Sequence, residues 1–161
     1  SSSASSRREE ERALEVVDTV AGLVELAGLL GKETEFGVDV EVENQRSYDG
    51  LCCLIQISTR SRDFVVDAIA LHDEIGEVLG PVFSDEKVVK VFHACDGLDV
   101  PSLHRDFQIY VVNAFDTQLA TSCLCSRRPS LIETLRRLHV CSPGVLRRHE
   151  NLKATYQRSD W

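Results

Sequence analysis

The segment 36–42 alternates apolar and polar side chains, which is the pattern of a β-strand with one face in a core. The even-numbered residues from Phe36 to Val42 share the apolar face, and Asp39 and Glu41 project from the other, about 7 Å apart along the strand. Two carboxylates on one face of a rigid strand repel each other, and a divalent cation would remove that repulsion. The pattern therefore predicts either a metal site or the solvated face of an edge strand.

Two further strands are predicted directly after this one. Residues 51–58 are nearly all apolar, which favours a central strand buried on both faces, and residues 63–67 follow after a short turn. Three strands joined by short connections are typical of an antiparallel meander.

The pattern changes after residue 70, where helices and strands alternate. A short strand at 16–17 and a helix that begins at Asp18 or Thr19 and ends at Gly31 precede the meander. The later helices are predicted at 71–79, at 99–106, from Asp116-Thr117 onward and at 130–138, and the later strands at 88–93 and 109–113. Together these elements predict an α/β fold with a mixed sheet.

The length of the chain and its net charge argue against several classes of protein. The 161 residues suit one domain, predicted over 13–161 after a disordered or frayed tail at 1–12. The net charge of −8 argues against a protein that coats nucleic acid through excess positive charge. No apolar run approaches the ~20 residues that span a bilayer, so no membrane association is expected. The cysteines lack zinc-type spacing and predict an intracellular protein with structural thiols.

Blocks of sequence in a fixed order resemble the 3′–5′ exonuclease domain of the ribonuclease D family, in the branch of the nuclear exosome exonuclease. The resemblance runs from about residue 18 to residue 161 and is far more specific than the carboxylate pair alone. Its blocks are Glu35 to Glu41, Arg46-Ser47-Tyr48, Leu54 to Arg60, Arg62 to Asp67, Lys90 to Ala94, Arg105-Asp106-Phe107, Tyr110 to Asn113 and Phe115-Asp116-Thr117.

The resemblance implies a ribonuclease H-like fold and hydrolysis from the 3′ end of single-stranded RNA by a two-metal mechanism. In this family, four acidic residues in three motifs hold two divalent cations, Mg²⁺ or Mn²⁺. Asp39 and Glu41 match the first motif. The resemblance implies that Asp39 bridges both ions and that Glu41 binds the ion that activates water, near the terminal nucleotide.

The second motif departs from the family pattern by one residue. Counting back from Arg105 selects Asp99 as the third metal ligand, whereas counting forward from His93 falls one residue short, on Leu98. Asp96 is the competing candidate, and it leaves the downstream register wrong. A helix that begins at Asp99 can accept Pro101 in its first turn.

The third motif of the family, Tyr-x-x-x-Asp, is not assigned in this chain. Tyr156 and Asp160 have the spacing, but they resemble a different block that precedes the true motif, so neither is predicted to be catalytic. The sequence thus predicts a domain that is incomplete at its C-terminus.

Smaller features receive structural explanations. His93 is expected to be a hydrogen-bonded residue rather than a base, and Asp116 to cap the helix that it begins. The basic clusters Arg127-Arg128, Arg136-Arg137 and Arg147 to His149 suit either a phosphate backbone or a solvated helix face.

The predicted function is 3′–5′ exoribonuclease activity in RNA processing or decay, with an exosome-type complex as a partner and the nucleus or nucleolus as the location. Two alternatives stay open. One is a catalytically degenerate RNA-binding or scaffold module of the same fold. The other is a DNA-directed proofreading exonuclease, which the block Gln56 to Arg60 disfavours.

Overall fold

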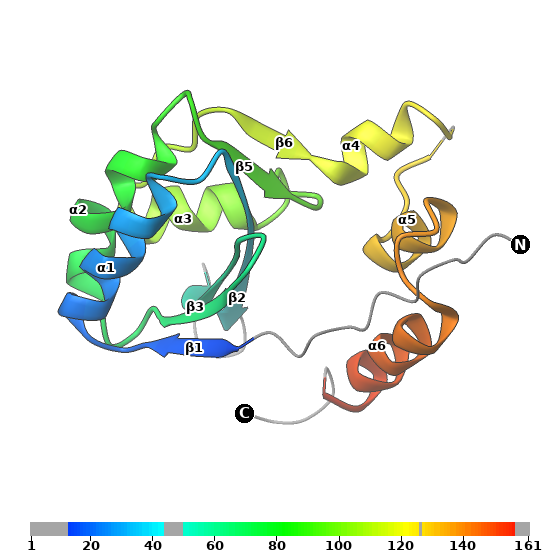
Figure 1. The fold of residues 1–161 in the computed structure, drawn as a ribbon, viewed down its shortest axis with the longest axis horizontal. Coiled ribbons are helices and arrows are strands. Elements are labelled where there is room, and N and C mark those ends of the chain that lie inside the picture. The colour runs from blue at the N-terminus through cyan, green and yellow to red at the C-terminus, as the bar shows by residue number, and fades with distance from the viewer. Residues whose placement is uncertain (1–12, 44–49, 126, 157–161) are drawn as a thin grey trace, which may run out of the picture.

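The computed structural model describes residues 13–43, 50–125 and 127–156, and these form a six-stranded mixed sheet with helices around it (Figure 1). The strand order is β1-β4-β3-β2-β5-β6. The strands are β1 (Leu14–Val17), β2 (Glu35–Glu43), β3 (Leu51–Ser58), β4 (Asp63–Asp67), β5 (Val89–Phe92) and β6 (Ala114–Asp116). The helices are α1 (Val20–Leu30), α2 (His72–Phe83), α3 (Asp99–Phe107), α4 (Thr117–Ser122), α5 (Leu131–Arg137) and α6 (Pro143–Tyr156).

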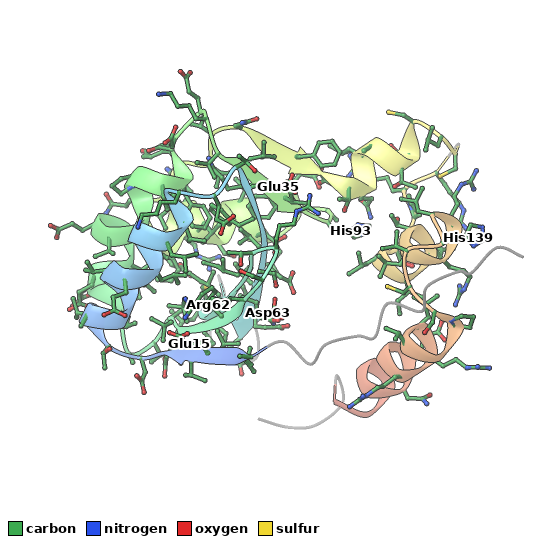
Figure 2. All side chains as sticks on the ribbon, in the orientation of Figure 1. Glu15, Glu35, Arg62, Asp63, His93 and His139 are labelled. Carbon is green, nitrogen blue, oxygen red and sulfur yellow. The ribbon has the colours of Figure 1, made fainter. Side chains whose placement is uncertain are left out.

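The predicted meander is confirmed, because β2 pairs antiparallel with β3 and β3 pairs antiparallel with β4. β1 adds to β4 in parallel, and an ion pair between Arg62 and Glu15 joins the two strands at their starts (Figure 2). On the other side, β5 lies parallel to β2 and β6 lies parallel to β5. The sheet is therefore mixed, as the sequence predicted.

The core lies between the apolar face of the sheet and the first three helices. It joins Val38 of β2 and Ile55 of β3 to Leu23 of α1, Ile75 of α2 and Leu103 of α3. α1 and α2 lie side by side on the left of Figure 1, and α5 and α6 lie on the opposite side of the sheet from them. Burial of this apolar surface is the main term that stabilises the fold.

The prediction that β3 is buried on both faces is wrong. Ile55 and Ile57 are fully buried on the helix side, whereas Leu54 and Gln56 on the opposite face are only partly covered. We call this opposite face of β2, β3 and β4 the open face, and Asp39 and Glu41 belong to it. The apolar run at 51–57 reflects the central position of the strand, not two covered faces.

The predicted strand at 109–113 is also wrong, because the strand that joins the sheet is β6, at Ala114–Asp116. Left-handed residues bracket the earlier segment, with φ of 56° at Gln108 and 57° at Asn113. Between them, Ile109 is buried and the Val112 amide donates to the Phe83 carbonyl at the end of α2. The segment satisfies its backbone against a helix, so its β-like composition does not produce a strand.

Helix ends follow the sequence signals closely. Thr19 caps α1 by accepting from the Gly22 amide, and Asp116 caps α4. Ser130 and Glu133 form a capping box at α5. The sequence analysis assigned no helix over 143–156, although Ser142 before Pro143 is a start signal, and the Val145 amide donates to the Ser142 hydroxyl.

A close approach of α2 to the end of α3 requires glycine at position 76. A Cβ at Gly76 would collide with the Phe107 backbone carbonyl, which cannot move without displacing α3. We expect Gly76→Ala to lower the free energy of unfolding by about 1–3 kcal/mol, measured by urea titration. Gly80→Ala on the same helix is the matched control, because a Cβ there meets nothing within 4 Å. An unchanged stability for Gly76→Ala would contradict this packing.

Candidate active site

The predicted alternation of β2 is present in the structure. Val38 and Val40 are buried on the helix side. Asp39 and Glu41 lie on the open face, where each residue is exposed overall although neighbouring atoms cover part of its carboxylate. Within the described residues, β5 pairs with β2 only at residues 35–37, so the later part of β2 does not pair with β5. The start of α3 approaches this later part of β2.

Asp99 is the first residue of α3 and is buried, with 6% of its surface exposed. Burial and the neighbouring charge of Asp39 raise the pKa of Asp99 to about 7, although a hydrogen bond from the Val40 amide acts in the opposite direction. The charge of Glu41 also raises this pKa. The carboxylate of Asp99 is therefore electrostatically coupled to both carboxylates on β2.

The pKa values of the two carboxylates on β2 are raised as well. Burial raises the pKa of Asp39 above its usual range, and the Val40 amide and the charge of His93 partly offset that rise. Burial and then the charge of Asp39 raise the pKa of Glu41. Asp39, Glu41 and Asp99, which we call the acidic cluster, thus repel one another and favour a bound proton or a cation.

The two candidates for the second motif have different surroundings. Asp96 lies on the surface, where its carboxylate accepts a hydrogen bond from Arg128 at 3.0 Å. Asp99 faces the other two members of the acidic cluster. An ion pair with an arginine occupies the Asp96 carboxylate, and this arrangement favours Asp99 as the third ligand.

The acidic cluster fits a hard divalent cation by its chemistry, because each of its side chains offers carboxylate oxygens and the three are mutually repulsive. Over residues 13–43, 50–125 and 127–156, no three His, Cys, Asp or Glu side chains are gathered into a ready metal cage. The argument for a cation at this site therefore depends on the three carboxylates and their mutual repulsion.

His93, the residue after β5, lies near the acidic cluster and makes hydrogen bonds through both ring nitrogens. His93 Nδ1 lies 2.9 Å from Thr117 Oγ1, and His93 Nε2 lies 3.2 Å from the Pro129 carbonyl oxygen. Figure 2 shows His93 between the sheet and α5. The Gln118 side chain donates to the same Pro129 carbonyl at 3.0 Å. The His93 ring is thus hydrogen-bonded, as predicted, and it joins the sheet to the segment before α5.

Asp116 has a wider role than the predicted cap. Its carboxylate accepts from the amides of Gln118 and Leu119 in α4 and also from those of Ala94 and Cys95 after β5. Burial alone would raise the pKa of Asp116, but these amides hold it below its usual range. Asp116 therefore fixes the connection that leads to Asp99.

Arg127, Arg128 and Arg136 of the arginine clusters pair with acidic side chains. Arg127 pairs with Glu133 at 2.6 Å, and Arg136 pairs with Glu150 at 2.8 Å. Exposed pairs of this kind contribute little to stability. The geometry agrees with a solvated helix face and leaves contact with a phosphate backbone untested.

Comparison with known proteins identifies the family. The family model described as a 3′–5′ exonuclease matches residues 14–161 of the chain. The chain belongs to the 3′–5′ exonuclease family. The exonuclease domain is 46% identical over 145 residues to protein RRP6-like 3 of Arabidopsis thaliana, covering 90% of this chain and 15% of that protein. It is 38% identical over 152 residues to exosome complex component 10 of Homo sapiens, covering 94% of this chain and 16% of the human protein.

Solved structures agree with this assignment. The catalytic core of RRP6 from Trypanosoma brucei superimposes with a TM-score of 0.81 at 36% identity, over 96% of this chain and 40% of that chain. Escherichia coli RNase D, at 20% identity and a TM-score of 0.75 over 92% of this chain and 37% of that chain, shares the fold. The exonuclease domain therefore has the predicted ribonuclease H-like fold, and it spans less than a quarter of the length of the Arabidopsis relatives.

Some of the predictions concern residues that the structure does not describe. The tail at 1–12, the block Arg46-Ser47-Tyr48 and Asp160 lie outside the described residues, and of Tyr156 only its place in α6 is described. In the part of the chain that is described, no helix combines the length and the apolar character needed to cross a membrane.

Proposed function

We propose that the exonuclease domain removes nucleotides one at a time from the 3′ end of single-stranded RNA and releases nucleoside 5′-monophosphates. The observation that carries the proposal is the coupling of Asp39, Glu41 and Asp99, with the Asp99 carboxylate hydrogen-bonded to the Val40 amide of β2, in a chain of the 3′–5′ exonuclease family. The similarity to RRP6 and exosome complex component 10 favours RNA over DNA as the substrate.

Asp39, Glu41 and Asp99 would hold two divalent cations, Mg²⁺ or Mn²⁺. The chemistry supplied by such a bound pair is stabilisation of the attacking and the leaving oxygens in an in-line phosphodiester displacement. The β2 strand presents Asp39 and Glu41 on one face, and the start of α3 brings the Asp99 carboxylate to the Val40 amide of the same strand. Asp99 must lose its proton to bind a cation, so acid below about pH 7 competes with metal at this residue.

The second candidate function is a noncatalytic RNA-binding or scaffold module. The observation that favours it is that the acidic cluster is not a ready metal cage within the described residues. Such a module would bind RNA with the same affinity after Asp39→Ala and would cleave nothing.

An exosome-type complex is the proposed partner, and the nucleus or nucleolus is the proposed location. The similarity to the human and rat proteins named exosome complex component 10 supports the partner. The location follows from the same resemblance and stays a prediction.

The experiment uses the protein expressed from its complete coding sequence and a single-stranded RNA labelled at its 5′ end. In Mg²⁺, we expect a ladder that shortens by one nucleotide at a time and a matching yield of 5′-monophosphates. An RNA with a blocked 3′ end and a DNA of the same sequence are the controls, and both should be degraded more slowly. Internal cleavage would overturn the proposal, and RNA binding without cleavage would favour the noncatalytic module.

A further inference from the structure

A polar side chain on β3, that of Gln56, lies beside the acidic cluster. Gln56 pairs directly with Asp39 in the antiparallel register of β2 and β3. Directly paired residues of neighbouring strands project from the same face, so Gln56 belongs to the open face. In the sequence, Gln56 stands out as the amide side chain within the otherwise apolar run of 51–57.

The Gln56 side chain reaches diagonally across the strands. Gln56 Nε2 donates a hydrogen bond to Glu41 Oε1 at 3.4 Å, although Glu41 itself pairs with Leu54. Long side chains reach diagonal neighbours of this kind on one sheet face. The amide therefore contacts one member of the acidic cluster while it lies opposite another.

The pairing of β2 with β3 shifts register between Glu41 and Val42. Irregularities of this kind change the direction of nearby side chains and weaken the local ladder. Glu41 is the last residue before this irregularity, and a hydrogen bond from β3 restricts the position of its side chain. An amide does so without adding a fourth negative charge next to Asp39 and Glu41.

We propose that Gln56 is a positioning residue for the exonuclease reaction, which holds the Glu41 carboxylate on the open face so that Glu41 and Asp39 serve one cation site. This inference rests on the proposed function. It predicts that loss of the amide weakens metal binding and lowers kcat, because Gln56 acts through Glu41. It predicts little change in KM, because Gln56 has no assigned contact with the body of the RNA.

The test compares Gln56→Met, which keeps the length of the side chain and removes the donor, with the protein expressed from its complete coding sequence. Mn²⁺ binding is measured by calorimetry without RNA, and trimming of RNA is measured separately. We expect the Kd for Mn²⁺ to rise about tenfold or more, as for other residues that orient metal ligands, and kcat to fall by a similar factor with KM within about twofold. Gln56→Asn keeps an amide but is one methylene shorter, and it should show the same loss.

Leu54→Met is the matched control, because it alters the neighbouring side chain on the same face of β3 without changing a donor. The thermal unfolding midpoint of each variant reports on folding. Mn²⁺ binding and kcat at the wild-type level in both Gln56 variants would overturn the inference, as would an equal loss in Leu54→Met. If the unmodified protein binds Mn²⁺ and trims RNA while Asp39→Asn does neither, the proposed function stands whatever Gln56 does. If the unmodified protein binds no Mn²⁺, the proposed metal site fails first.

Discussion

We expect Asp39→Asn to reduce RNA cleavage by at least about 1,000-fold, which corresponds to about 4 kcal/mol of transition-state stabilisation. Asparagine keeps the shape of the side chain but removes the negative charge that a divalent cation requires. Asp39 is coupled to both Glu41 and Asp99, so this substitution removes a charge that acts on both other members of the acidic cluster. Cleavage is measured as the initial rate of RNA shortening in Mg²⁺.

The fold of this variant should persist. Without metal, Asp39→Asn relieves repulsion with Glu41 and Asp99, so the unfolding midpoint should stay the same or rise slightly. Asp73→Asn is the control for charge, because the Asp73 side chain is 95% exposed on α2. Cleavage at the wild-type rate by Asp39→Asn would contradict the proposed catalytic role, and a large fall in its midpoint would assign Asp39 a structural role instead.

The second large effect concerns Asp99 and pH. The pKa of Asp99 is raised from 3.8 to about 7, so between these values the folded state binds a proton that the unfolded chain has released. The free energy of unfolding therefore falls as pH rises through this window. We expect Asp99→Asn, in EDTA at pH 8, to be more stable than the unmodified protein by an amount on the order of a few kcal/mol. The difference should disappear near pH 4 and below.

The same variant should lose cleavage, since asparagine removes the charged ligand from α3. Urea unfolding at pH 4 and pH 8 measures the stability difference, and RNA shortening measures the activity. Lower stability of Asp99→Asn at pH 8 would show that the ionised carboxylate stabilises the fold, contrary to this prediction.

In the unmodified protein, Mn²⁺ affinity should weaken as pH falls below about 7, because Asp99 takes up a proton. Asp96→Asn should leave Mn²⁺ affinity unchanged and is the matched control.

The sequence predicted the structure best where the local residue pattern and the tertiary packing favour the same conformation. The alternation at 36–42 predicted both the strand and the face that carries Asp39 and Glu41, because a side-chain period of two fixes which residues share a face. Ser130 and Asp116 predicted helix starts, since their side chains accept from backbone amides that lie within three residues.

The sequence was least informative where distant segments decide the structure. The segment 109–113 has strand composition, but the Phe83 carbonyl takes its backbone donor and excludes it from the sheet. The position of Gln56 beside Glu41 depends on the register between two strands, which composition does not determine. The inserted residue before Asp99 left Asp96 open as a ligand, and only the approach of α3 to β2 distinguishes their surroundings.

The proposed function requires Asp39, Glu41 and Asp99 to form a centre for divalent cations. The most direct measurement is anomalous X-ray scattering from crystals of the protein, expressed from its complete coding sequence and grown with Mn²⁺. We predict manganese peaks within coordination distance of carboxylate oxygens of Asp39, Glu41 and Asp99, and none at Asp96. A protein that binds RNA while no manganese peak touches Asp39 or Asp99 would contradict the claim and would support the noncatalytic module.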